Sequence, residues 1–152
     1  MKYAGFVISA AICLLLAGCG AAGPASSGIV GQPNGAPVRL GATVAEVQKA
    51  LNTGVEPQQR GAAHELVVRS GIKVLFDANM KVSTVRLDAP YPTPVMGVAI
   101  GDSEEGMLAL LGRAKIIRTP EQTAYTYFPD AATMLTFVVN PQHKVETIFL
   151  EH

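Results

Sequence analysis

Apolar and polar residues alternate with a period of two along six short stretches of the chain. Three lie in the first half and three in the second: His64–Ser70, Ile72–Asp77, Lys81–Leu87, Gln122–Phe128, Met134–Val139 and Lys144–Leu150. Such alternation, with many β-branched residues, is typical of half-buried β-strands. The connections Asp77–Met80 and Asn140–His143 contain turn-forming residues, which predicts antiparallel meanders. A further short strand is predicted over Lys115–Arg118.

Two segments with helical spacing precede these strands. Thr43 and Glu46 have the spacing of a capping box, in which each residue satisfies a free backbone amide of the first turn. Ser103 is the predicted N-cap of the second segment, and Gly112 is its expected stop. Apolar residues then recur one helical turn apart: Val47, Leu51, Met107, Leu110 and Leu111.

The two halves of the chain follow the same order of elements. The residues around Gly41 align with those around Gly101 at a shift of 60 positions, and Lys81–Asp88 aligns with Lys144–Glu151 at a shift of 63. We expect a duplication, the alternative being two unrelated amphipathic stretches. The predicted fold is α+β, with two tandem repeats, each a short helical segment packed on an antiparallel β-meander. The repeats are expected at residues 38–88 and 98–152, joined by a proline-rich linker at 89–97.

The alternation also assigns residues to the two faces of each predicted meander. One face is expected to pack on the helices: Val74, Phe76, Val85, Leu87, Leu135, Phe137, Ile148 and Leu150. The opposite face is expected to carry Leu75, Val82, Thr84, Arg86, Met134, Val138, Val145 and Phe149. The second set is too apolar for an ordinary solvated sheet, which predicts either a contact between repeats or a surface that receives a partner.

Two tyrosines are the main candidates for partner contact beside that face. Tyr125 and Tyr127 are two residues apart in one predicted strand, so their side chains share a face. Tyrosine is favoured at interfaces because it offers apolar area together with a hydroxyl group. The alternative is that both pack in the core with their hydroxyls reaching the edge. The candidate partner-binding residues are Tyr125, Tyr127, Phe149, Arg86 and Val82.

The first twenty residues have the pattern of an export signal. An apolar run from Phe6 to Leu16 follows Lys2 and is shorter than the ~20 residues that a membrane-spanning helix needs. Residues 1–18 are therefore predicted to be a signal peptide. Residues 19–37, rich in Gly, Ala, Pro and Ser, are predicted to form a disordered tether.

The end of this signal, Leu16-Ala17-Gly18-Cys19, resembles the lipobox of bacterial lipoproteins. The resemblance implies diacylglycerol on the Cys19 thiol and an acyl chain such as palmitate on the new amino terminus, which together anchor a protein durably. Gly20, where an aspartate would favour the inner membrane, implies an outer-membrane location facing the periplasm. The alternative is an ordinary signal peptide that ends in a chance cysteine.

Composition and motifs argue against several classes of function. Removal of residues 1–18 leaves 11 Lys and Arg against 12 Asp and Glu with no basic run, so no nucleic-acid partner is expected. The histidines His64, His143 and His152 lack the spacing of metal ligands. No serine lies in a nucleophile elbow, and no cofactor is predicted. We therefore expect a chain that is not an enzyme.

A glycine, a hydroxyl N-cap and an apolar helix before a meander, best seen from Ile100 to Gly112, resemble a small protein superfamily. Its members include the β-lactamase inhibitor protein and the outer-membrane lipoproteins of the β-barrel assembly machinery. The resemblance implies helices on one face of an antiparallel sheet and action by protein binding. The chain departs from it in lacking mature-domain disulfides and in having two units where assembly lipoproteins usually have one.

The sequence therefore predicts a membrane-anchored envelope lipoprotein that acts in the periplasm as a non-catalytic protein-binding or scaffold module. Its expected partners are the membrane, through the lipid, and an envelope protein. The alternative is a protein inhibitor of an envelope hydrolase.

Overall fold

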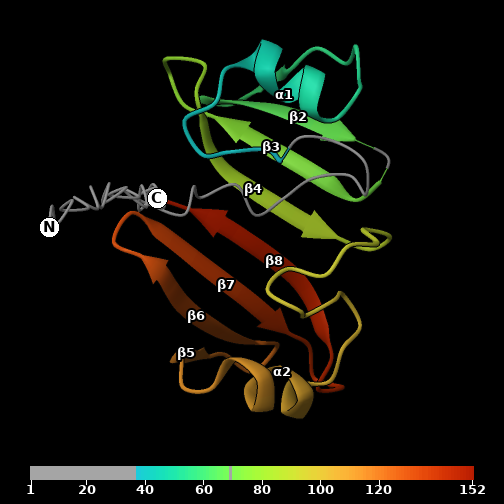
Figure 1. Ribbon diagram of the computed structural model, residues 1–152, viewed down its shortest axis with the longest axis vertical. Helices are drawn as coiled ribbons and strands as arrows, with labels where there is room; N and C mark the ends of the chain where they lie inside the picture. The colour runs from blue at the N-terminus through green and yellow to red at the C-terminus, as the bar shows by residue number, and fades with distance from the viewer. Residues whose placement is uncertain (1–36, 69) are drawn as a thin grey trace, which may run out of the picture.

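A computed structural model describes residues 37–68 and 70–152, so the predicted signal peptide, Cys19 and nearly all of the tether lie outside the described residues. The described chain is α+β, as predicted, with two short helices and one antiparallel sheet of eight strands (Figure 1). The elements are α1 (Val44–Ala50), β1 (Gln58–Arg60), β2 (Ala63–Val68), β3 (Ile72–Phe76), β4 (Val82–Asp88), α2 (Glu104–Leu111), β5 (Lys115–Arg118), β6 (Thr123–Asp130), β7 (Thr133–Val139) and β8 (Val145–Glu151). The predicted strands are confirmed, and β1 is an addition.

The strand order is β1-β2-β3-β4-β8-β7-β6-β5, so the two meanders join where β4 pairs with β8. Val85 lies opposite Leu150 and Leu87 opposite Ile148, with the strands antiparallel. The halves therefore meet edge to edge through backbone pairing and form one continuous sheet.

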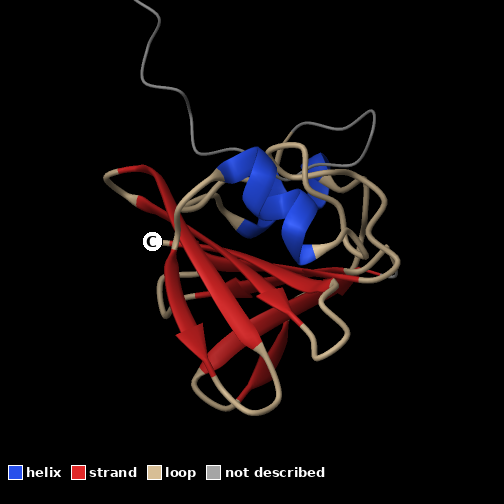
Figure 2. Ribbon diagram, turned by 90° about the horizontal axis from the view of Figure 1, so that it is seen from below, coloured by secondary structure: helices blue, strands red, loops and turns tan. Residues whose placement is uncertain are grey.

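Both helices lie on the same side of the sheet (Figure 2). The predicted capping box of α1 is present: the Thr43 amide donates to the Glu46 carboxylate at 2.7 Å, and the Glu46 amide donates to the Thr43 hydroxyl at 3.3 Å. Ser103 caps α2 by accepting from the Gly106 amide at 3.1 Å, and Gly112 is its C-cap. These caps satisfy amides that the first helical turn leaves free.

The core lies between the sheet and the helices. All eight residues predicted for the helix-facing side are at most 1 % exposed: Val74, Phe76, Val85, Leu87, Leu135, Phe137, Ile148 and Leu150. The segment 89–97 contains no strand, and two of its residues, Tyr91 and Val95, are buried in the same core. The proline-rich connection is therefore packed against the domain.

Two β-bulges overturn part of the predicted face assignment. Val82 pairs with Phe76 while Thr84 pairs with Leu75, which leaves Ser83 as an extra residue. The extra residue reverses the alternation, so Val82 points into the core and is 1 % exposed. An equivalent shift puts Val145 there as well, also 1 % exposed. The prediction that both valines lie on the outer face was wrong because it assumed unbroken alternation.

The first residue of each bulged strand accepts a backbone hydrogen bond from a glycine that lies three residues before a helix. The Gly41 amide donates to the Val82 carbonyl at 2.7 Å, and the Gly101 amide donates to the Val145 carbonyl at 2.7 Å. Both glycines have a left-handed backbone, with φ of 76° and 93°, which glycine adopts without the strain imposed by a side chain. The same contact thus recurs at both ends of the molecule.

Candidate functional site

The structure separates the five candidate partner-binding residues. Val82 and Tyr125 are buried in the core at 1 % exposure, so the expectation that they face a partner is corrected. Tyr127 is half-buried and packs against the same core. Arg86 and Phe149 lie directly opposite each other on β4 and β8, on the side of the sheet away from the helices.

Both tyrosines pack in the core, which was the alternative to a position at an interface. Tyr125 lies opposite Phe137 and Tyr127 opposite Leu135, whose side chains are both buried under the helices. The ring of Tyr127 meets Phe137 edge to face at 5.9 Å between centroids, and its hydroxyl donates to the Gly112 carbonyl at 3.2 Å. Burial raises the pKa of Tyr127. Both hydroxyls reach the edge of the core while the rings fill it.

A polar cluster at the start of α2 was not predicted. The Glu104 carboxylate accepts a hydrogen bond from the Tyr125 hydroxyl and lies 2.5 Å from Nδ1 of His143 in the β7–β8 turn. The bond from Tyr125, and then that from His143, hold the pKa of Glu104 below its usual value. Burial, followed by the bond to Glu104, raises the pKa of Tyr125. The three residues are too far apart in the chain to form a sequence motif.

This cluster fastens α2 to the sheet. No group of three His, Cys, Asp or Glu side chains within residues 37–68 and 70–152 is placed to hold a metal ion. His143 is 79 % exposed and Glu104 only 19 %. The arrangement joins a surface imidazole, a sheltered carboxylate and a buried phenol.

The uncovered face of the sheet has Arg86 and Phe149 at its centre. The Arg86 guanidinium lies over the Phe149 ring at 5.5 Å, and its Nε is 2.8 Å from an Asp88 carboxylate oxygen. Thr147 also donates to Asp88, at 2.8 Å. A cation held over an aromatic face and fixed by a carboxylate has little freedom to move. The central row therefore presents an ordered surface to solvent.

Lys73 and Thr136 flank that row directly, and two apolar side chains lie in the neighbouring row, separated there by Thr84 and Glu151. Leu75 on β3 and Met134 on β7 are half-buried on the uncovered side, as are Arg86 and Phe149 themselves. The sequence indicated these four residues, but not that β4 and β8 would bring the two sets together. Leu75, Arg86, Met134 and Phe149 together form the open face.

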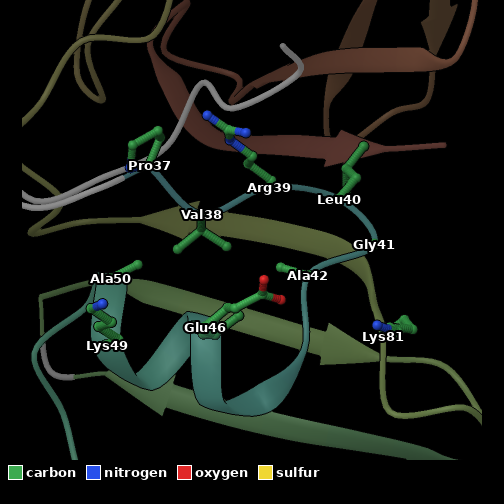
Figure 3. Close-up of a pocket in the computed structure, with 11 residues that line it drawn as sticks. Pro37, Val38, Arg39, Leu40, Gly41, Ala42, Glu46, Lys49, Ala50 and Lys81 are labelled. Atoms are coloured by element: carbon green, nitrogen blue, oxygen red, sulfur yellow. The ribbon is translucent and has the colours of Figure 1, made fainter.

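A depression of about 520 Å³ lies on the helix side, between α1 and the segment Val38–Ala42 that precedes it (Figure 3). The side chain of Val38 points toward α1, whereas that of Arg39 points the opposite way. The Glu46 carboxylate lines the depression but is already bonded to Thr43, whose amide holds the pKa of Glu46 below its usual value. The depression therefore offers a shallow floor with apolar residues, lined also by the basic side chains of Arg39, Lys49 and Lys81.

No protein-family model matches the chain. No curated protein matches it either. Among solved structures, it is similar to a DUF4309 family protein, YjgB, from Bacillus subtilis, at 16 % identity and a TM-score of 0.51, over 72 % of this chain and 78 % of that one. The likeness is one of fold.

An extracellular protein containing an SCP domain, from Bacillus anthracis, is a weaker match, at 10 % identity and a TM-score of 0.45. This match covers 74 % of the chain and 43 % of that protein, and at this score it supports no argument. Neither of the two helices described is long and apolar enough to cross a membrane.

Proposed function

We propose that this chain is an envelope lipoprotein, anchored through Cys19 in the outer membrane and facing the periplasm, that acts without catalysis as a protein-binding or scaffold module. The observation that carries the proposal is the open face: one aromatic and two aliphatic side chains with a fixed guanidinium, set among polar residues on a side of the sheet that no described helix covers. Aromatic residues and arginine are the side chains most enriched at the centres of protein interfaces.

We further propose that residues 38–88 and 98–152 are tandem repeats. The proposal is supported by the two glycine-to-bulge contacts and by the two hairpin turns. Asp77 accepts from the Asn79 and Lys81 amides at 2.8 and 2.9 Å. Asn140 accepts from the Gln142 and Lys144 amides at 3.1 and 3.0 Å. A tandem repeat of this kind is what the resemblance to the β-lactamase inhibitor protein implies.

The test is photo-crosslinking in cells with the full chain, carrying the crosslinker at Thr84, which is half-buried opposite Leu75. We expect one envelope protein to be captured and to be lost when Phe149→Ala removes the central ring. Leu110→Ala is the matched control, because Leu110 is an exposed apolar residue, 59 % accessible, on the helix side. Capture that Phe149→Ala leaves unchanged would contradict the proposal.

Inhibition of an envelope hydrolase is the second candidate, and one observation favours it. Phe128 is 63 % exposed near the β6–β7 turn, where an aromatic side chain can enter a partner's cleft. Assay of the captured protein separates the two functions, because an inhibitor lowers the activity of its hydrolase and a scaffold does not. Phe128→Ala should abolish inhibition and leave scaffold binding intact.

A further inference from the structure

One edge of the sheet is open and apolar. The strand order ends at β5, which pairs with β6 along one side, Ile116 opposite Tyr125 and Ile117 opposite Ala124. Within a paired edge strand, half of the backbone N–H and C=O groups point away from the neighbour. No described strand pairs with these groups, so an added strand can.

The side chains of β5 leave this edge accessible. All four residues are exposed, with Ile116 43 % and Ile117 55 % accessible on opposite faces of the strand. Edge strands are normally protected by shortness, charge or polar residues, and β5 is protected only in part: it has four residues, with Lys115 and Arg118 at its ends and two isoleucines at its centre. The opposite edge, β1 (Gln58–Arg60), is more fully protected: it has three residues, all polar, and its arginine pairs with Glu65 at 3.3 Å.

Basic residues surround the apolar pair. Arg113, Lys115 and Arg118 are all exposed, and none forms an ion pair within the part of the chain that the structure describes. The charge of Arg118 helps to lower the pKa of Glu104, after the two hydrogen bonds to that carboxylate. The edge therefore combines backbone groups that no described strand pairs with, apolar side chains and positive charge.

We propose that β5 is a docking edge for an extended acidic segment of a partner protein, which adds to the sheet as a further strand. Backbone pairing would supply affinity, the two isoleucines would contact apolar side chains on both faces, and carboxylates flanking the segment would meet Arg113 and Lys115. The inference rests on the proposed protein-binding function but uses a surface separate from the open face.

A second copy of this chain is a poor occupant of the edge. If two β5 strands paired antiparallel about their centres, Lys115 of each copy would lie opposite Arg118 of the other. Like charges directly opposite each other destabilise a strand pair. The charge pattern thus favours an acidic segment over self-pairing.

The test measures peptide binding to the full mature chain in detergent micelles by fluorescence anisotropy. The probe is a short peptide in which valine and threonine alternate between pairs of glutamates, and its counterpart has lysines in place of the glutamates. We expect the acidic peptide to bind about tenfold more tightly than the basic one, because two or three exposed ion pairs form in one case and are replaced by repulsion in the other. The difference should shrink as salt is added.

Charge reversal makes the test specific to β5. Arg113→Glu/Lys115→Glu should reverse the preference, so that the lysine-flanked peptide binds more tightly. Arg39→Glu/Lys49→Glu is the matched control, since it changes the net charge equally at exposed positions beside α1 and should leave the preference intact. A proline at the centre of the acidic peptide should abolish binding, because it removes a ladder hydrogen bond.

Three results would overturn the inference: no binding of either peptide, equal binding of both, or a preference that the charge reversal leaves unchanged. Dimerisation of the chain that Ile117→Lys abolishes would also overturn it, by showing that a second copy occupies the edge. Capture through the open face is measured separately by the Phe149→Ala comparison. If that capture persists when the peptide test fails, the docking edge is wrong and the proposed function stands.

Discussion

The residues of the first half that align with Glu104, Tyr125 and His143 are apolar. At the shifts of 60 and 63 positions, Glu104 corresponds to Val44 and His143 to Met80. Tyr125 lies opposite Phe137 as Leu66 lies opposite Val74. The second helix is held by a carboxylate that accepts from two side chains. Because charge is involved, this attachment depends on pH.

Glu104→Gln is expected to lower the free energy of unfolding at pH 7 by about 1–2 kcal/mol, since hydrogen bonds to a charged group are replaced by bonds to a neutral amide. The pKa of Glu104 is lower in the folded state than its ordinary value of 4.5. Its stabilisation is therefore complete above that ordinary value and is lost as pH falls through the lower folded-state pKa. Urea denaturation across this pH range measures the effect.

Glu105→Gln is the control for Glu104→Gln, because Glu105 is the exposed neighbour in the same helical turn. The control should change the unfolding free energy by less than about 0.5 kcal/mol. If the unfolding free energy of the Glu104→Gln variant stays below that of the natural chain by the same amount down to the pH of acid unfolding, the carboxylate charge contributes nothing.

Cys19→Ser is expected to release the chain from membranes or to leave the precursor uncleaved, because a hydroxyl cannot replace the thiol that receives the lipid. Fractionation of cells and the mass of the chain measure both outcomes. Cys13→Ser is the control, since Cys13 lies within the predicted signal peptide. A Cys19→Ser chain that is fully processed and still membrane-bound contradicts the lipoprotein proposal.

At the scale of elements, each helix is attached through a glycine with a left-handed backbone. Gly41→Ala and Gly101→Ala are each expected to lower the unfolding free energy by about 1–2 kcal/mol, since an L-residue is strained in this conformation. No atom lies within 4 Å of a Cβ added at either position, so backbone strain is the whole cause. Thermal or urea unfolding measures the loss.

Gly54→Ala is the matched control for the two glycine substitutions. An added Cβ at Gly54 also meets no atom within 4 Å, and its backbone is not left-handed. Its unfolding free energy should stay the same or rise slightly, because alanine reduces the freedom of the unfolded chain. Equal losses at all three positions would rule out the conformational explanation.

The sequence was sufficient to predict elements with strong local signals. It was insufficient for features that depend on which strands pair and in what register. Caps such as Thr43 and Ser103 act within one turn, and alternation reveals a strand with one buried face, so both were predictable. β1 carries only polar residues and gives no such signal. The bulge at Ser83 depends on which residue of β3 lies opposite, and that is decided by tertiary contacts.

The candidate site was predictable only in part for the same reason. The outward register of Arg86 and Phe149 follows from alternation, but their contact follows from the β4–β8 pairing, which no local pattern encodes. Tyrosine is a residue type favoured at interfaces, yet a buried phenol needs only one polar partner, and Glu104 supplies it to Tyr125. Composition alone cannot distinguish these two environments.

At the scale of the whole molecule, one hydrophobic core serves both meanders. We expect Leu150→Ala, in β8, to cost about 2–5 kcal/mol, because it removes a fully buried side chain opposite Val85. Hydrogen-exchange protection should fall equally in β3 and β7, because β3 pairs with β4 and β7 pairs with β8, the two strands that join the halves. Protection that falls in β7 alone would show that the halves unfold independently.

The pairing of β4 with β8 also means that β4 lacks one neighbouring strand until β8 is available. β8 is the last of the described strands along the chain, yet it lies in the middle of the sheet. A chain that crosses a membrane amino terminus first presents β4 long before β8 arrives, and the inner edge of β4 remains open during that interval. An open edge invites pairing with other chains, so for the exported lipoprotein that we propose, this interval is the stage most exposed to aggregation.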